Sequence, residues 1–123
     1  MALNPISGRT GAFDWLFQRV SGVVLAVAFA AHFIVLHMMG DGPIDYKSVM
    51  TRLANPAWKV FDLVFLLFAL YHAVTGMRLI VDDYIHHAGL RTFLTCCLWV
   101  LAVILFFTGV VIIFSIKAPG AAG

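Results

Sequence analysis

Three long apolar stretches constrain the fold of this chain more than any other feature. They cover residues 20–39, 60–81 and 93–116, each close to the roughly 20 residues that a helix needs to cross about 30 Å of hydrocarbon. Hydrophobic residues make up 63% of the 123-residue chain and charged residues only 11%, which excludes a water-soluble enzyme domain and a disordered tail. The sequence therefore predicts an all-α membrane protein with three transmembrane helices.

Turn-forming and charged residues separate the three apolar stretches. Gly40–Pro43 and the pair Asn55-Pro56 lie between the first two, and residues 82–89 lie between the second and the third. No internal repeat and no linker divides the chain. We therefore expect residues 1–123 to form a single membrane-anchor domain.

The first apolar stretch is longer than the core of a signal peptide, so we expect it to remain in the protein. Just before it, four apolar residues recur at helical spacing, which predicts an amphipathic helix at the membrane interface: Phe13, Leu16, Phe17 and Val20. Simple lipid anchoring explains the same pattern.

The net charge of +2 gives no basic block that could follow a nucleic-acid backbone. Four basic residues fall on each side of the predicted membrane, so the positive-inside rule does not orient the chain. The neighbouring Cys96 and Cys97 form neither a spaced metal site nor a Cys-x-x-Cys-His haem attachment site. A haem, if bound, is therefore held non-covalently.

Ionisable residues inside a membrane helix are costly and call for a reason. We expect Asp62 and Arg78, near the ends of the second stretch, to be solvated at the interfaces. His72 lies deeper and is followed one turn later by Gly76 on the same helix face, where a missing side chain leaves room for a flat macrocycle. Two interpretations of His72 stand at this point: an iron ligand, or a histidine hydrogen-bonded between helices.

Asp83 and Tyr84 follow His72 by about 16–18 Å of helix, which places them at the membrane surface. A tyrosine hydroxyl there can donate a hydrogen bond to a quinone carbonyl, with the carboxylate of Asp83 orienting it or relaying protons. The alternative is an interfacial tyrosine beside a solvated acid.

Several short motifs, taken in their order and spacing, resemble the small hydrophobic anchor subunit (the D subunit) of bacterial succinate dehydrogenase. Before the first span, the family's Gly-Arg-x-Gly-x-x-Asp-x-x-x-x-Arg pattern is matched by Gly8, Arg9, Gly11, Asp14 and Arg19. Its His-Ala-x-x-Gly-Met segment ending in Asp-Tyr is matched by His72, Ala73, Gly76, Met77, Asp83 and Tyr84, and Leu90 and Arg91 open the third helix.

The resemblance implies a role for each matching residue. His72 corresponds to an axial ligand of b-type haem, whose other ligand comes from a partner anchor subunit, and Gly76 belongs to the same haem site. Tyr84 and Asp83 correspond to the site that binds ubiquinone or menaquinone. Arg19 is placed near the haem propionates or the quinone, and contact with lipid phosphate is its alternative.

The resemblance further implies a non-catalytic subunit of succinate:quinone oxidoreductase, respiratory complex II, within a six-helix heterodimeric anchor bundle. Its partners are a second anchor subunit, an iron–sulfur subunit and a flavoprotein, and the FAD and iron–sulfur clusters lie in those partners alone. The implied location is the bacterial inner membrane, with a cytoplasmic N-terminus and a periplasmic C-terminus. Whether the chain acts in succinate oxidation or in fumarate reduction stays open.

His32 and His37 lie outside the matched motifs. Counting residues inward from Val20 and Val81 predicts that His32 and His72 lie within one helix turn of each other in depth. A haem held within this chain, or a second haem on His32 or His37, therefore stays open. Two other classes also remain: a haem-free transporter or proton-conducting protein that uses Asp62, His72 and His32 as a relay, and a purely structural subunit.

Overall fold

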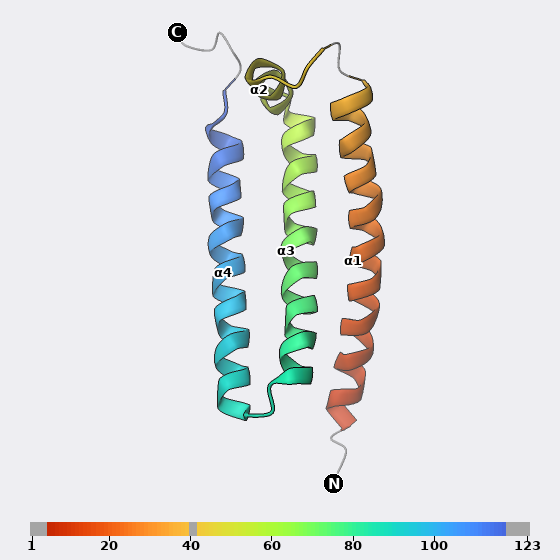
Figure 1. Ribbon diagram of the computed structural model, residues 1–123, viewed down its shortest axis with the longest axis vertical. Helices are drawn as coiled ribbons and strands as arrows, with labels where there is room; N and C mark the ends of the chain where they lie inside the picture. The colour runs from red at the N-terminus through yellow and green to blue at the C-terminus, as the bar shows by residue number, and fades with distance from the viewer. Residues whose placement is uncertain (1–4, 40–41, 118–123) are drawn as a thin grey trace.

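The computed structural model describes residues 5–39 and 42–117, and these form four helices. Three of them are long: α1 (Pro5–Met38), α3 (Pro56–Tyr84) and α4 (Ala88–Ser115). The short helix α2 (Tyr46–Ala54) lies across the end of the molecule at which α3 begins (Figure 1). Each long helix contains a segment long and apolar enough to cross a membrane, which confirms the all-α membrane fold.

All three long helices begin before the predicted spans, and the helix content differs from the prediction in two further respects. α1 runs without a break through Phe13 and Val20, so the separate amphipathic helix predicted before the first span is wrong. Helix α2 was not predicted, because it lies in the connection between the turn formers at Gly40–Pro43 and Asn55-Pro56. The predicted turn at Gly40 and Asp41 lies outside the described residues.

Local hydrogen bonds explain where the helices begin. Asn55 caps α3 by accepting a 2.9 Å hydrogen bond from the Ala57 N–H, and Pro56 at the first helical position needs no such partner. Asp45 caps α2 in a reciprocal arrangement with Ser48. His87, at the start of α4, accepts from the Leu90 N–H with its ring nitrogen. Two of the turn signals in the sequence, Asn55-Pro56 and residues 82–89, therefore contain helix caps.

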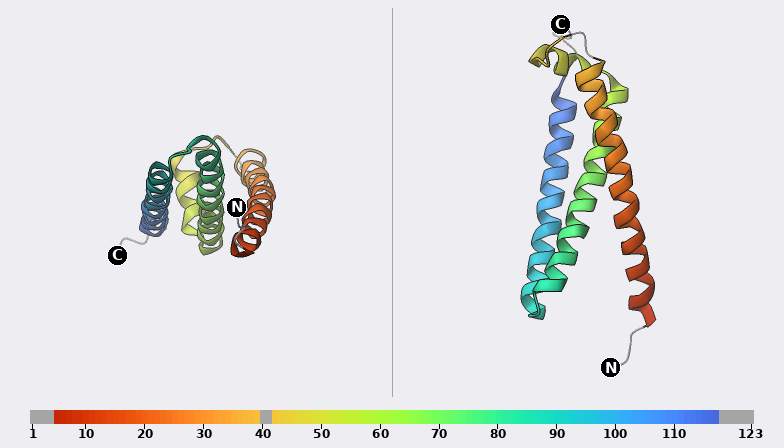
Figure 2. Two further views of the ribbon diagram at one scale, coloured as in Figure 1. Left: turned by 90° about the horizontal axis from the view of Figure 1, so that it is seen from below. Right: turned by 45° about the vertical axis from the view of Figure 1, so that its right-hand side comes forward.

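The three long helices stand in a row, with α3 between α1 and α4 (Figures 1 and 2). Successive long helices run antiparallel, so the beginning of α1 lies at the same end as the turn between α3 and α4 (Figure 1). A row of three leaves two open faces. Among the described residues, the buried apolar side chains are only Val74, Ala102 and Ile113. Most of the apolar surface therefore faces lipid or a partner.

The two interfaces of α3 differ in chemistry. Toward α4 the contact is apolar: a Cβ on Gly109 would overlap the side chain of Leu66, so the glycine permits close packing. Toward α1 the buried residues include Ser21 and Thr75, which are polar. Because unpaired polar groups are costly in hydrocarbon, the interface between α1 and α3 needs internal hydrogen bonds.

Candidate functional site between α1 and α3

His72 projects from α3 against α1, where the side chain of Ser21 holds its ring. The Nδ1 atom of His72 lies 3.0 Å from the Oγ of Ser21. Ser21 is almost fully buried, with 2% of its surface exposed, and its hydroxyl lies 3.0 Å from the backbone oxygen of Gln18. Within the described part of the chain, the ring makes its hydrogen bond through Nδ1, and Nε2 stays available for another partner.

The backbone of α1 at Gly22 forms a second wall of the imidazole site. A Cβ on Gly22 would lie 3.2 Å from Cε1 of His72, closer than ordinary van der Waals contact. Glycine therefore lets the ring lie against the helix backbone. Ser21 and Gly22 together fix both the position and the orientation of the ring.

Gln18 and Thr75 form a second pair of polar side chains about one helix turn from Ser21 and His72. We call these four residues the His72 cluster: Gln18, Ser21, His72 and Thr75. The Gln18 Nε2 donates a 3.3 Å hydrogen bond to the backbone oxygen of His72, and the Thr75 hydroxyl contacts Gln18 Oε1. Thr75 has 9% of its surface exposed. The cluster therefore ties α1 to α3 through hydrogen bonds inside the apolar layer.

Gly76 belongs to this interface as well. A Cβ on Gly76 would lie 3.0 Å from the Gln18 side-chain nitrogen, so the glycine admits the Gln18 amide. That role is separate from the predicted one of clearing space for a macrocycle, which stays a prediction. Four residues of this site were not predicted from the sequence: Gln18, Ser21, Gly22 and Thr75. Their signal was the presence of polar and small residues at helical spacing around Arg19 and His72.

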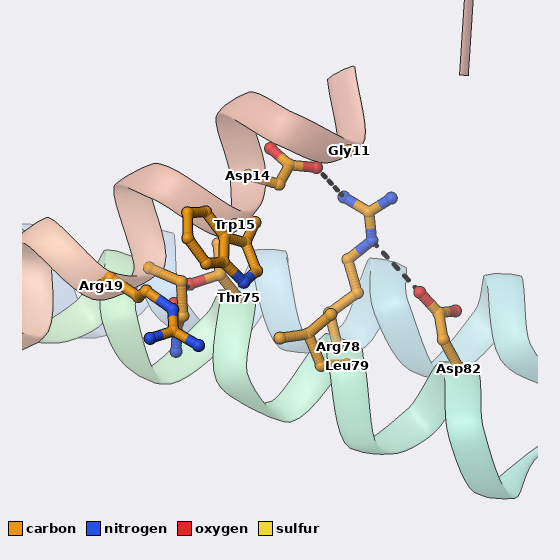
Figure 3. Close-up of a pocket in the computed structure, with 9 residues that line it drawn as sticks. Gly11, Asp14, Trp15, Arg19, Thr75, Arg78, Leu79 and Asp82 are labelled. Carbon is orange, nitrogen blue, oxygen red and sulfur yellow. Dashed lines mark hydrogen bonds and ion pairs between the residues drawn. The ribbon is translucent and has the colours of Figure 1, made fainter. Parts of the chain in front are cut away.

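Charged residues meet at the end of the row where α1 begins. The guanidinium of Arg78 lies 3.8 Å from Asp14 on α1 and 3.7 Å from Asp82 on its own helix (Figure 3). Arg91 on α4 lies 3.6 Å from the other oxygen of Asp82. Arg78 was expected to be solvated at the interface. It is half exposed but also paired with two acids, so the charges link all three long helices.

A cleft of about 510 Å³ opens between α1 and α3 beside these charges. Its walls include Asp14, Trp15, Arg19, Arg78 and Leu79 (Figure 3). The guanidinium of Arg19 lies 4.4 Å from the centre of the Trp15 ring, a cation–π contact that holds the cation at the cleft. Gln18 and Thr75 of the His72 cluster also line it. The cleft therefore brings acids, cations and an aromatic ring together next to the His72 cluster.

Asp83 and Tyr84 lie at the same end but outside the cleft. Both side chains are exposed, Tyr84 by 78%. The acid that lines the cleft is their neighbour Asp82. Within the described residues, neither Asp83 nor Tyr84 contacts the His72 cluster, so any shared ligand has to reach across the end of α3.

His32 also lies between α1 and α3, in different surroundings. Its Nδ1 is 3.8 Å from a carboxylate oxygen of Asp62 and has no hydrogen bond within the described residues. The ring stacks with Phe61 and Phe65 at centroid distances of 6.1 Å. His37 is exposed and packs on Phe33, 4.4 Å between ring centres.

The register of the helices separates the two half-buried histidines, His32 and His72. His32 pairs with Asp62, which precedes His72 by ten residues of α3, or about 15 Å along the helix axis. The predicted depth match between His32 and His72 is therefore wrong. The count treated Val20 and Val81 as level, whereas the residue next to Val20, Ser21, contacts His72. One iron cannot bind both rings in this arrangement, and the relay through Asp62, His72 and His32 is interrupted.

In the described ranges, no group of three or more His, Cys, Asp or Glu side chains is placed to hold a metal ion. Among the residues of the His72 cluster, His72 is the one imidazole, so a metal bound there needs a further ligand from elsewhere. A porphyrin supplies four nitrogens itself and needs only axial ligands, so the donor set fits a haem better than a bare metal ion. The Nδ1 contact of His72 is typical of an imidazole that is oriented to bind metal through its other nitrogen.

Comparison with known proteins gives one consistent result. A family model described as "Succinate dehydrogenase/Fumarate reductase transmembrane subunit" matches residues 2–111. Curated relatives named as succinate dehydrogenase hydrophobic membrane anchor subunits include those of Archaeoglobus fulgidus, 35% identical over 83% of this chain and 87% of the relative, and Rickettsia prowazekii, 31% identical over 92% and 89%. The Rickettsia typhi relative is 36% identical over 69% of this chain and 66% of its own length.

Proposed function

The chain belongs to the succinate dehydrogenase/fumarate reductase transmembrane subunit family, and on that basis we propose that it supplies a haem ligand and part of a quinone site to succinate:quinone oxidoreductase. Its relatives are named as membrane anchors, and the three apolar helices suit that role. We expect the carbon chemistry to take place in a flavoprotein subunit. The anchor contributes position and electrostatics.

One observation carries the haem proposal: the imidazole of His72 is held at Nδ1, in a membrane helix, with Nε2 left for a ligand. A haem would bring electron-transfer chemistry to this depth of the membrane. His72 would provide one axial ligand, and the second would come from a partner anchor subunit. Arg19, held at the neighbouring cleft by Trp15, is suited to meet the anionic propionates of such a group.

The quinone proposal is supported by chemistry at the end of α3. Tyr84 presents an exposed hydroxyl beside Asp83, and both lie at the end where the charged cleft opens. A quinone takes up two protons on reduction, and acids at the membrane surface can deliver them from water. Tyr84 would donate a hydrogen bond to the quinone carbonyl, and Asp83 would orient it or pass on a proton. Ubiquinone and menaquinone both suit this chemistry.

The open faces of the helix row support a partner anchor subunit. An isolated row buries few apolar side chains, whereas a second set of three helices would cover one face and make a six-helix bundle. The iron–sulfur and flavoprotein subunits would dock at the end that carries Asp82 and Tyr84. In the proposed orientation this end lies on the cytoplasmic side of the inner membrane, so the N-terminus is cytoplasmic and the C-terminus periplasmic.

The proposal is tested by purifying the intact complex from membranes through a tag on this chain. We expect a flavoprotein, an iron–sulfur protein and a second anchor to co-purify, with one b-type haem per complex in the reduced-minus-oxidised absorption spectrum. Two haems per complex would require a ligand besides His72, and His32 would become the next candidate. A preparation with neither haem nor these subunits would overturn the proposal.

A further inference from the structure

The hydroxyl of Ser21 lies between two hydrogen-bonding groups, and one of these groups can accept a hydrogen bond but cannot donate one. It is 3.0 Å from the Gln18 backbone oxygen and 3.0 Å from Nδ1 of His72. A serine hydroxyl has one proton to donate, and a carbonyl oxygen only accepts. The imidazole nitrogen can either donate or accept, depending on its tautomer.

The Gln18 carbonyl therefore sets the direction of the chain of hydrogen bonds. If Ser21 donated to Nδ1, its oxygen lone pairs would face the carbonyl oxygen of Gln18 without a proton between them. If Ser21 donates to Gln18, its lone pair accepts the proton on Nδ1, and all three groups are satisfied. Since Ser21 is buried, water is not available as a substitute partner.

Resting on the haem-binding role proposed for His72, we propose that Ser21 is a positioning residue that fixes His72 in the tautomer with its proton on Nδ1. Nε2 then carries a lone pair, the form that an axial iron ligand requires. Gly22 supports the same orientation, because the ring edge at Cε1 lies against its backbone. The serine acts on the metal site through the ligand and does not touch the metal.

A hydrogen bond from Nδ1 also makes Nε2 a stronger electron donor. A stronger donor stabilises ferric iron relative to ferrous iron, so Ser21 should hold the haem midpoint potential down. Loss of the hydroxyl leaves the His72 ligand in place but frees the ring to rotate and to change tautomer. The haem should then bind more weakly and have a more positive potential.

The first test compares three variants of the purified complex by redox potentiometry and haem retention. Ser21→Ala should keep haem, shift its potential positive and release it about tenfold or more faster on dilution in detergent. Ser21→Thr retains a hydroxyl and should restore the potential. Ser115→Ala is the matched control, since the hydrogen bond of its hydroxyl among the described residues goes to the Val111 carbonyl, 2.6 Å away on the same helix. Wild-type potential and retention in Ser21→Ala would overturn the proposal.

The second test needs no substitution at Ser21 and so survives a folding defect in that variant. Nitrogen-15 NMR of the full chain in lipid bilayers, before haem is added, reports which nitrogen of His72 carries the proton. We expect Nδ1 protonated and Nε2 unprotonated, and the reverse would overturn the proposal. If His72→Ala retains haem, or the wild-type complex has none, the haem-binding role fails. If His72→Ala loses haem while Ser21→Ala behaves as wild type, only the role of Ser21 fails.

Discussion

Two histidines lie in the same interface between α1 and α3, and their surroundings differ in one decisive respect. His72 is held at Nδ1 by a buried hydroxyl that is itself bound to the backbone. His32 stacks on Phe61 and Phe65, and its Nδ1 lies 3.8 Å from the nearest Asp62 oxygen with no hydrogen bond in the described structure. One ring has a fixed orientation through a hydrogen bond, whereas the other is held mainly by packing.

Depth in the membrane and residue type do not by themselves distinguish the two histidines, whereas their hydrogen bonding does. Both histidines lie inside apolar helices, and both face α3 or α1. A metal site also needs a partner on the second ring nitrogen, which selects tautomer and orientation. His72 has that partner, and His32 has a nearby carboxylate at a longer distance.

The largest expected effect comes from removing each histidine in turn. His72→Ala should abolish b-type haem in the purified complex, because among the described residues no other imidazole lies at the level of His72 along α3. His32→Ala is the matched control and should retain the full haem content. Absorption spectra with haem quantitation check both. Loss of haem in His32→Ala with retention in His72→Ala would reverse the comparison.

A large effect on turnover, without loss of haem, is expected at the end of α3. Tyr84→Phe should keep haem and lower quinone-dependent succinate oxidation by about tenfold or more, since the hydrogen bond to the quinone carbonyl is lost. Tyr46→Phe is the control, because Tyr46 is equally exposed but lies at the opposite end, at the start of α2. Steady-state assays with quinone and with an artificial electron acceptor separate quinone reduction from succinate oxidation. Equal quinone turnover in both variants would remove Tyr84 from the site.

A smaller effect is expected from crowding the His72 ring. Gly22→Ala places a methyl group 3.2 Å from Cε1, so the ring or the helix has to move by a few tenths of an ångström. Gly11→Ala, on the same helix, meets no atom within 4 Å and should gain about 0.5–1 kcal/mol from better helix propensity. Gly22→Ala should lower the thermal unfolding temperature and alter the haem spectrum, whereas Gly11→Ala should do neither. Identical behaviour of the two variants would mean that the ring is not confined there.

The smallest effect concerns α2, at the end of the molecule near His32. The backbone N–H of Ser48 donates to Asp45 and lowers the pKa of that carboxyl below its ordinary value of 3.8. A lowered folded-state pKa means that the cap stabilises α2 fully above pH 3.8 and is lost as the pH falls through the lower value. Hydrogen exchange in α2 should therefore quicken only in strong acid.

Asp45→Asn provides the control for this pH effect, because asparagine caps a helix but does not titrate. Exchange in the Asn variant should not depend on this ionisation. The haem proposed at His72 should be unaffected in the wild type and in Asp45→Asn, since α2 lies at the end where α3 begins. A change in the haem spectrum of Asp45→Asn would show that the two regions are coupled.

Much of the fold could be predicted because membrane helices follow from length and hydrophobicity alone. The three spans and the Asn55-Pro56 break depend on local sequence, and the structure has both. Helix α2 could not be recognised in the same way, because its stability depends on the reciprocal cap between Asp45 and Ser48 rather than on an apolar run.

The site was harder to predict because it depends on the register between two helices. His72 could be selected from its residue type and its setting, but Ser21 is separated from it by 51 residues of sequence. Polar and small residues recur at helical spacing around Arg19 and His72, but the sequence does not give the register that makes Gln18, Ser21 and Thr75 partners of His72. The predicted depth of His32 was wrong for the same reason, because the register between α1 and α3 was not known from the sequence.

The most direct test of the account is a cryo-electron microscopy map of the purified complex at a resolution that defines side chains. We predict a haem whose iron is bonded to Nε2 of His72, with Ser21 at hydrogen-bond distance from Nδ1 and His32 free of metal. An iron bonded to His32, or a His72 ring with no haem beside it, would contradict the account.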